Sequence, residues 1–379
     1  MLGVVIVLIM ILAGCSLASV SPMPSSSVVP SEEVSRAAPS STERSVTPTR
    51  PPEAPVKKVA KPWKKGAFQK GVQVYWHTGG SDEHVRARAT VILDYVVSLG
   101  ANSVGLTFPL YTDGVTPTRV YAGKETPTPR ELSVVIAVAH ERGLRVMLRP
   151  ILDEENIAAE QKGAWRGTIQ PPNVEAWFTS YIKALAPYQQ LAGQAEVAEF
   201  VVGVELFSLE RYSGQWKRVK RSTAKYFDGE LSFAVNWDAV GRNKMPFKAL
   251  GLDMYPAVDL PDSASVGRLT RALEQWLDRN AKPAHRNIVI QEVGIAGIPD
   301  AYRNPWYWGS GKADSRYFGT QERWFEAAYR ASKKSGMKGI YYWMVDSNQE
   351  FTREAVKAQS AGGFIGRPAE DAIRRSFTS

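Results

Sequence analysis

Two glutamates occupy the same unusual place in the sequence, each at the end of a short apolar run. Glu205 closes "EFVVGVE" and Glu292 closes "NIVIQE". A carboxylate in such a place is costly to bury unless it is paired or takes part in chemistry. Hydrolysis of a glycosidic bond needs two carboxyl groups, because one protonates the departing oxygen while the other attacks the anomeric carbon or activates water. A structural ion pair, for example with Arg149, is the alternative.

Polar and aromatic residues end the other apolar runs as well. Aromatic rings pack against the C–H face of a sugar, whereas Asn, Arg and Asp bind its hydroxyl groups. Trp76 and Trp343 could instead only pack at the edge of a sheet, and Arg149 could only neutralise a carboxylate. The predicted substrate-binding residues are Trp76, His77, Arg149, Asp153, Asn236, Trp237, Asp253, Tyr255, Trp306 and Trp343.

Other kinds of catalytic site have no signature in this sequence. Its four histidines are scattered, with no HxH or HExxH pair, and no serine lies in a GxSxG turn. We therefore predict neither a metal site nor a cofactor. Glu210, which follows Glu205 closely, is expected to be solvated or to cap the next helix.

The elements that position these residues alternate along the chain from Gly71 onward. Alternating short β-rich runs and longer amphipathic segments predict a parallel sheet, and the near-continuous apolar runs predict that both of its faces are covered. Eight such units fit a closed (β/α)8 TIM barrel, whose chemistry lies at the carboxyl ends of the strands. The predicted strands are residues 71–76, 103–111, 145–152, 199–206, 230–237, 249–256, 287–294 and 339–345; the predicted helices include 84–99, 130–143, 174–193, 213–227, 264–279 and 320–335.

A doubly wound open sheet is the competing fold. Such a sheet usually carries a glycine-rich phosphate loop after its first strand. The corresponding stretch here, "YWHTGGSDEH", has no GxGxxG pattern. The closed barrel is therefore the preferred interpretation.

Seven stretches lie in order between about residues 70 and 350: "WRGTIQPPNVEAWFTSY", "VVGVELFSLE", "YFDGELSFAVNWD", "LGLDMYP", "IQEVGIAG", "TQERWFEAAYRA" and "GIYYWMVDSN". Together they resemble glycoside hydrolase family 113, the β-mannanase-type barrels of clan A. The resemblance implies a TIM barrel in which Glu205 is the general acid/base and Glu292 is the nucleophile of a retaining, two-step mechanism. Tyr255 would then bond the nucleophile and Trp343 would lie under the sugar.

The sugar itself is less well defined by this resemblance. Many clan A enzymes place an asparagine before the acid/base, where it bonds the sugar 2-hydroxyl, but this chain has Val204 there. A β-linked, mannose-containing glycan is the expected substrate, and another β-glycan or a cell-wall amino sugar is the alternative. A barrel that binds carbohydrate with little turnover, carried as a surface lipoprotein, is a second function class.

A long connection follows the run that ends at Glu292. It reads "GIPDAYRNPWYWGSGKADSRYFG" (297–319) and contains a cluster of aromatic residues around Trp306. Long loops of this kind are more often binding walls or lids than filler. We expect it to cover the cleft near Glu292, with packing against a neighbouring loop as the alternative.

The first residues resemble the leader of a bacterial lipoprotein. Residues 2–13 are continuously apolar, which suits a signal peptide rather than a membrane span. The run ends in "LAGC", which resembles a lipobox, and Cys15 is the only cysteine of the chain. We expect a signal peptide (1–15), lipidation at Cys15 and a protein exported to the outer face of the cell membrane. A buried thiol beside a chance match is the alternative.

A Ser-, Pro- and Thr-rich segment (16–66) follows, with a basic end, and is predicted to be a disordered tether before the barrel domain (67–379). Residues 16–70 hold nine Lys/Arg and four Glu, a net +5 of the total +9. The basic character is therefore mostly a property of the tether, where it suits an anionic membrane or wall polymer. Nucleic acid is not an expected partner, and the protein is expected to be a monomer.

Overall fold

The computed structural model describes residues 56–242, 244–283, 287–309 and 313–379. The predicted signal peptide, Cys15 and the tether as far as residue 55 lie outside the described residues. The described part of the chain belongs to a single compact unit. No helix within it is long and apolar enough to cross a membrane.

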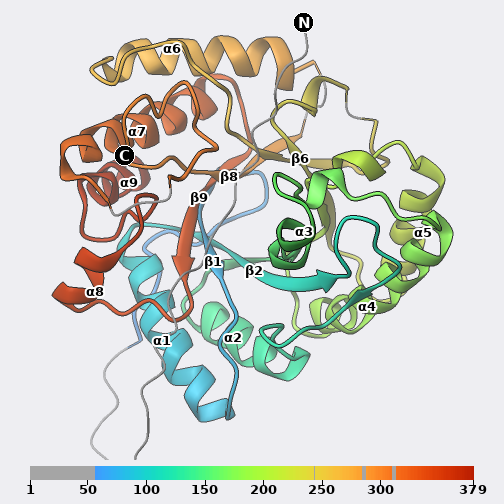
Figure 1. The fold of residues 1–379 in the computed structure, drawn as a ribbon. Helices are drawn as coiled ribbons and strands as arrows, with labels where there is room; N and C mark the ends of the chain where they lie inside the picture. The colour runs from blue at the N-terminus through green and yellow to red at the C-terminus, as the bar shows by residue number, and fades with distance from the viewer. Residues whose placement is uncertain (1–55, 243, 284–286, 310–312) are drawn as a thin grey trace, which may run out of the picture. The chain divides into compact units, whose positions relative to one another are not determined.

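Eight parallel strands close into a barrel, which confirms the predicted TIM fold (Figure 1). The order of the strands in the sheet is β1-β9-β8-β7-β6-β5-β4-β2, and β2 pairs with β1 to complete the ring. The short β3 (Val120–Tyr121) adds to β2 in the antiparallel sense. The barrel strands are β1 (Gln69–Tyr75), β2 (Ser103–Thr112), β4 (Arg145–Leu152), β5 (Glu199–Val204), β6 (Glu230–Asn236), β7 (Ala249–Asp253), β8 (Ile288–Val293) and β9 (Gly339–Asp346).

Helices surround the strands, as Figure 1 shows. The connection from β6 to β7 is an exception, because its described residues hold only a 3-10 turn (Val240–Arg242). The larger helices are α1 (Asp82–Ser98), α2 (Pro129–Glu141), α4 (Val174–Gln194), α5 (Ser213–Thr223), α6 (Val266–Trp276), α7 (Phe318–Lys334) and α9 (Pro368–Thr378); α3 (Glu155–Glu160) and α8 (Arg353–Ala358) are short.

Alternation along β4 shows how the barrel separates its two cores. Successive side chains of a strand point to opposite faces. Val146, Leu148 and Leu152 face the helices and join the large outer core. Met147 and Ile151 face the barrel interior together with Val201, Val204, Ala234, Val289 and Tyr341. Arg145 and Arg149 share the register of Met147, so two arginines lie inside the barrel.

A polar network fills the amino-terminal end of the barrel, which we call the floor. The Arg145 Nη2 atom contacts Glu199 Oε2 at 2.7 Å, and both side chains are almost fully buried. The other Glu199 oxygen accepts hydrogen bonds from Ser232 Oγ and Gln291 Nε2, both at 2.6 Å. Such a charge pair is tolerated in an interior because these hydrogen bonds satisfy it.

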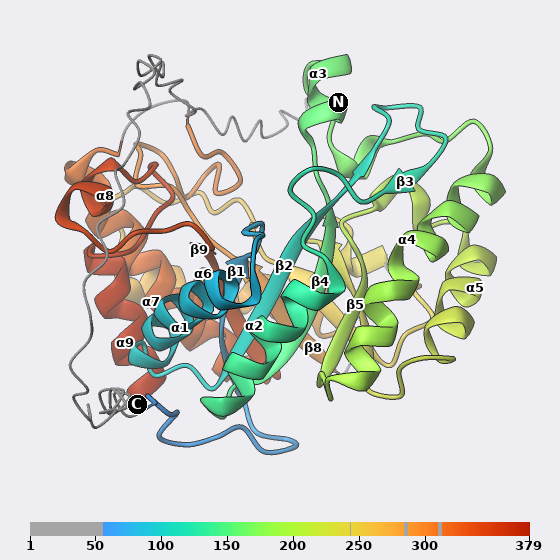
Figure 2. The same ribbon diagram turned by 90° about the horizontal axis from the view of Figure 1, so that it is seen from below.

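Residues 56–66 cover this floor, although composition assigns them to the tether. They form no helix or strand, but Val59 is buried and its N–H donates to the Arg142 carbonyl at 2.9 Å. The Arg145 guanidinium lies 5.0 Å from the centroid of the Trp63 ring. Figure 2 shows this blue segment beneath the barrel, at the end opposite α3 and β3. The packed domain therefore includes residues before position 67.

Candidate active site

Glu205 follows directly after β5 at the carboxyl end of the barrel. Its N–H donates to the Ala234 carbonyl of β6 at 2.8 Å, so the residue is tied to the sheet. Its φ of 51° lies in the left-handed region, which is strained for a residue with a side chain and is often found at functional sites. Arg166 Nη1 donates to Glu205 Oε2 at 2.8 Å.

Glu292 lies within β8, where the pairing register to β9 shifts between Ile290 and Val293. Such irregularities re-aim a side chain. Consecutive residues here both contact interior groups: Gln291 bonds Glu199 at the floor, and Glu292 meets Arg149 Nη2 at 2.9 Å. The Tyr255 hydroxyl donates to Glu292 Oε1 at 2.6 Å, which is the contact that the resemblance implied.

The two glutamates act on one another electrostatically. Burial, with smaller effects of the negative charges of Glu292 and Glu154, raises the pKa of Glu205 to about 7 against the opposing effect of Arg166 and Arg149. A pKa in this range suits a carboxyl that gives up and regains its proton near neutral pH. A carboxyl of raised pKa, together with a second carboxyl that accepts a hydrogen bond from Tyr255 and is ion-paired with Arg149, can supply a proton donor and a nucleophile in one site.

Arg149 and Asp253 lie beneath Glu292 and correct two of the sequence predictions. Neither side chain has exposed surface, and Arg149 Nη2 bonds Asp253 Oδ2 at 2.7 Å as well as Glu292. Burial raises the pKa of Asp253 well above its usual range, while the Arg149 guanidinium opposes that shift. Because both side chains are covered, neither offers surface to sugar hydroxyls; Arg149 is ion-paired with Glu292, and Asp253 accepts a hydrogen bond from Arg149.

Trp76 is also a core residue rather than a sugar-binding one. Its ring is fully buried in the outer core, and its indole N–H donates to the Thr78 carbonyl at 2.9 Å. The side chain of the preceding residue, Tyr75, packs against the interior cluster and donates to Asp153 Oδ2 at 3.4 Å. The predicted residue, Trp76, follows β1 directly and points into the outer core, whereas its neighbour Tyr75 points into the barrel.

His77, Asp153 and Asn236 remain partly exposed at the carboxyl ends of their strands, where they were predicted to lie. His77 Nε2 is 3.0 Å from both carboxylate oxygens of Asp346, and this contact raises the His77 pKa. Asn236 ends β6 in register with Asp253, which in turn is in register with Glu292.

Aromatic side chains from the long loop after β8 reach this site. Trp306 stacks on Trp237, with ring centroids 5.3 Å apart and planes 12° apart. Trp308 contacts Tyr255 edge to face at 6.2 Å, and Tyr255 bonds Glu292. The described part of the loop therefore comes near Glu292 through Trp308 and Tyr255, while Trp306 packs against Trp237 just after β6, which was the alternative; covering of the cleft stays a prediction. Trp343 is only 4% exposed and lies between Arg149 and Tyr75.

Comparison with known proteins shows the family of this chain. A family model for Glycoside Hydrolase Family 113 matches residues 74–363, which is more than half of the chain. The chain belongs to Glycoside Hydrolase Family 113. It is therefore a glycoside hydrolase. No curated protein matches its sequence.

Solved structures share the fold of this family 113 chain at low sequence identity. The GH113 β-mannanase AaManA from Alicyclobacillus acidocaldarius, in complex with ManMIm, is 21% identical with a TM-score of 0.68, over 82% of this chain and 97% of that one. A GH113 β-1,4-mannanase is 18% identical with a TM-score of 0.69, over 83% and 99%. The exo-β-1,4-mannosidase Op5Man5 from Opitutaceae bacterium strain TAV5 is 12% identical with a TM-score of 0.52, over 84% and 62%.

Two charged residues of the family 113 site were missed by sequence reasoning. Arg166 and Glu154 come from the connection between β4 and α4, and both side chains are largely buried beside Glu205. Glu154 directly follows the predicted Asp153 just beyond β4 but was not selected, and Arg166 begins the 3-10 turn Arg166–Thr168, which lies away from the strand ends that the prediction considered. The quoted stretch "WRGTIQPP" contains Arg166, and its charge in an otherwise uncharged run was the available signal.

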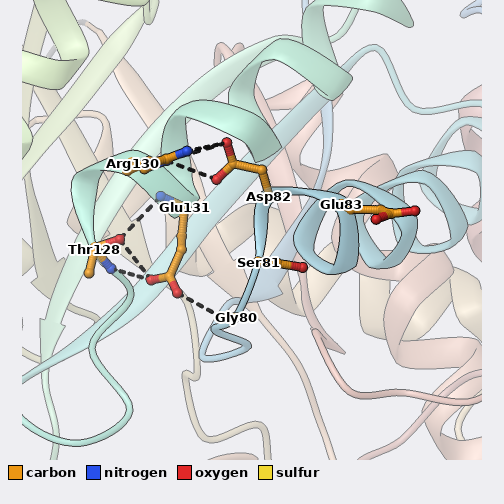
Figure 3. A pocket seen from close by; sticks show the side chains of 7 residues that line it. All are labelled: Gly80, Ser81, Asp82, Glu83, Thr128, Arg130 and Glu131. Carbon is orange, nitrogen blue, oxygen red and sulfur yellow. Dashed lines mark hydrogen bonds and ion pairs between the residues drawn. The ribbon is translucent and has the colours of Figure 1, made fainter.

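A separate pocket of ≈ 480 Å³ lies between the amino-terminal ends of α1 and α2 (Figure 3). Glu131 accepts hydrogen bonds there from the Gly80 and Thr128 N–H groups, and Asp82 forms an ion pair with Arg130 at 2.9 Å. These contacts fasten the loop after β1 to α2 and include none of the proposed site residues. Among the described residues, no group of three or more His, Cys, Asp or Glu side chains could hold a metal ion.

Proposed function

We propose that this family 113 enzyme is a retaining glycosidase that cleaves β-linked, mannose-containing glycans, with Glu205 as acid/base and Glu292 as nucleophile. The observation that carries the proposal is the unequal setting of two neighbouring carboxyls. Burial is the main cause that raises the pKa of Glu205 to about 7, whereas Glu292 accepts a hydrogen bond from Tyr255 and is ion-paired with Arg149. Environments that differ in this way separate an acid from a nucleophile.

In the first step, a Glu292 oxygen attacks the anomeric carbon while Glu205 gives its proton to the glycosidic oxygen, and the leaving sugar departs. The resulting glycosyl-enzyme ester is cleaved in the second step, in which ionised Glu205 takes a proton from the attacking water. Glu292 leaves as a carboxylate, and Glu205 is protonated again. The anomeric configuration is retained because it is inverted twice.

Family membership and the names of relatives support mannose as the sugar. Two solved members of the family are a β-mannanase and a β-1,4-mannanase by name. The stacked Trp237 and Trp306, both partly exposed, offer aromatic surface beside the site. Val204 precedes Glu205, so another group must bind the sugar 2-hydroxyl.

Proton NMR of fresh reaction mixtures tests this proposal. The purified protein is mixed with β-1,4-mannan, manno-oligosaccharides or an aryl β-mannoside, and the first anomer released is expected to be β. Release of the α anomer would contradict the retaining mechanism. Binding of manno-oligosaccharides without hydrolysis would support the alternative, a carbohydrate-binding surface lipoprotein. Hydrolysis of other β-glycans but not of mannosides would show that the substrate contains another sugar.

We also propose that the enzyme is exported and anchored to the outer face of the cell membrane through lipid on Cys15. The support is the sequence alone, namely the apolar run 2–13 and the "LAGC" that ends it. The full chain, expressed in a bacterium with labelled fatty acid, should carry the label and sediment with membranes. The Cys15→Ser variant should lose the label and become soluble; a labelled or membrane-bound variant would contradict the proposal.

A further inference from the structure

Arg166 is held at the active site by contacts in three directions. Its Nη1 donates to Glu205 Oε2 at 2.8 Å, and its Nε donates to the Leu152 carbonyl at 2.9 Å. Its Nη2 lies 3.3 Å from Glu154 Oε1, which also accepts a hydrogen bond from the Arg166 backbone N–H at 3.2 Å. The side chain is only 14% exposed, so its orientation is defined.

This position is unexpected for a cation. The acid/base must carry a proton in the first step, yet an adjacent arginine favours the ionised form. Glu154 has the opposite effect, because its carboxylate lies on the same guanidinium and raises the pKa of Glu205 through charge repulsion. The guanidinium is therefore shared by two carboxyls, of which only Glu205 is the proposed acid/base.

We propose that Arg166 and Glu154 form a positioning pair that serves Glu205 in both of its protonation states. This inference rests on the proposed function. Before the first step, Glu154 offsets the charge of Arg166 and allows Glu205 to keep its proton. After proton donation, Arg166 stabilises the new carboxylate and holds it in place to activate water in the second step.

Other charged groups also act on Glu205 and stay unchanged in the test. Arg149 of β4 lowers its pKa and Glu292 of β8 raises it. Asp253 at the end of β7 interacts with Glu205 electrostatically, and so does Tyr255, whose hydroxyl faces Glu292. The effect of Arg166 and Glu154 on the pKa of Glu205 is therefore measured as a difference between variants in which these four groups are unchanged.

The test is the alkaline limb of kcat/KM against pH, measured on an aryl β-mannoside or another substrate that the enzyme hydrolyses. Glu154→Gln removes a negative charge, so the limb should move by about one unit to lower pH. Arg166→Gln removes a positive charge, so the limb should move by about one unit to higher pH, with kcat reduced about 10- to 100-fold because the carboxyl loses its position. The double variant should restore the limb but not kcat.

Arg166→Lys and an exposed ion pair serve as controls. Lysine keeps the charge, so the limb should stay near its original pH while kcat falls. Glu175→Gln and Arg218→Gln, which change a pair of 4.0 Å with exposures of 79% and 33%, should alter neither quantity. If Arg166→Gln does not fold, Glu154→Gln and Arg166→Lys still decide the question.

Two outcomes would overturn the inference: limbs that do not move, or limbs that move in the same direction in both single variants. A loss of rate without opposed shifts would show a purely structural role. The proposed function fails separately, if the wild-type enzyme shows no hydrolysis or if Glu205→Ala keeps the alkaline limb. A limb that disappears in Glu205→Ala but is unchanged in the pair variants would remove this inference alone.

Discussion

At the scale of single residues, each proposed catalytic glutamate has its own arginine, and the two arginines differ in burial. Arg149 is completely enclosed and also bonds Asp253, whereas Arg166 reaches Glu205 from a loop and is partly exposed. Glu292 is thus held from beneath by the barrel, and Glu205 is held from the side. This difference suits a nucleophile that keeps a fixed position and an acid/base that loses and regains its proton.

Replacement of Glu205 by alanine should affect substrates unequally. A poor leaving group such as a sugar needs protonation, so its hydrolysis should fall by several orders of magnitude. An activated aryl glycoside needs little protonation, so its glycosylation step should be nearly unchanged. Steady-state and burst kinetics on both substrates measure the difference; equal losses would contradict the acid role.

Glu210 offers a pH-dependent stability prediction that does not depend on catalysis. Burial and the charge of Asp238 raise its pKa from the usual 4.5 to about 7, and its Oε1 atom is buried without a hydrogen-bond partner among the described residues. Between those pH values the folded protein binds more protons than the unfolded chain, so this residue makes stability fall as pH rises. Glu210→Gln should therefore raise Tm at pH 8.

The same variant should have the Tm of the wild type at pH 4, where Glu210 is protonated in both states. Thermal unfolding followed by circular dichroism at the two pH values gives the comparison. An equal effect of the substitution at both values would show that ionisation of Glu210 is not its cause.

Sequence reasoning could predict those site residues that lie at the ends of predicted strands, and it missed those that lie elsewhere. Glu205 and Glu292 were found because a carboxylate at the end of an apolar run is rare. Trp76 was misassigned because position in a strand end does not show which face a side chain takes, and a change of one residue reverses it. Arg166 was missed because it lies in a short 3-10 turn, which leaves no periodic pattern in the sequence.

At the scale of elements, the eight barrel strands were predicted to within a few residues, since each is a continuous apolar run covered on both faces. β3, α3 and α8 are too short for a periodic pattern, and α9 lies beyond the last predicted strand. The register shift that lets both Gln291 and Glu292 reach interior groups depends on pairing with β9 and is not visible in the run itself.

The floor network makes an element-scale prediction. Arg145→Met leaves Glu199 buried without its cation, so the free energy of unfolding should fall by about 3–5 kcal/mol. The exposed pair of Arg119 and Asp113 is a matched control, and Arg119→Met should cost less than about 1 kcal/mol. Urea unfolding measures both. Similar small losses would mean that Glu199 is satisfied by Ser232 and Gln291 alone.

At the scale of the whole molecule, one end of the barrel carries the proposed catalytic residues and the other end is closed by packing. The carboxyl ends of the strands carry the glutamates, and the amino ends are closed by the floor network and by residues 56–66 (Figure 2). The lysines of this segment are exposed while Val59 and Trp63 turn toward the barrel. Composition alone assigned the segment to the tether, because a few scattered apolar residues among five lysines give no recognisable pattern.

Two truncations should therefore behave differently. Removal of residues 1–55 should leave Tm and kcat/KM unchanged. Removal of residues 1–66 also removes Val59 and Trp63, which should cost about 2 kcal/mol or more and lower Tm by several degrees. Calorimetry on both proteins tests this, and equal Tm values would show that the segment contributes no stability.

The central claim is that Glu205 and Glu292 act on one glycosidic bond, and covalent trapping tests it most directly. The enzyme is incubated with a 2-deoxy-2-fluoro mannoside that carries a good leaving group, which slows the second step, and is then digested for mass spectrometry. The predicted result is a single added glycosyl group on the peptide that contains Glu292, with no label in Glu292→Ala. Label on another residue, or rapid turnover by Glu292→Ala, would contradict the account.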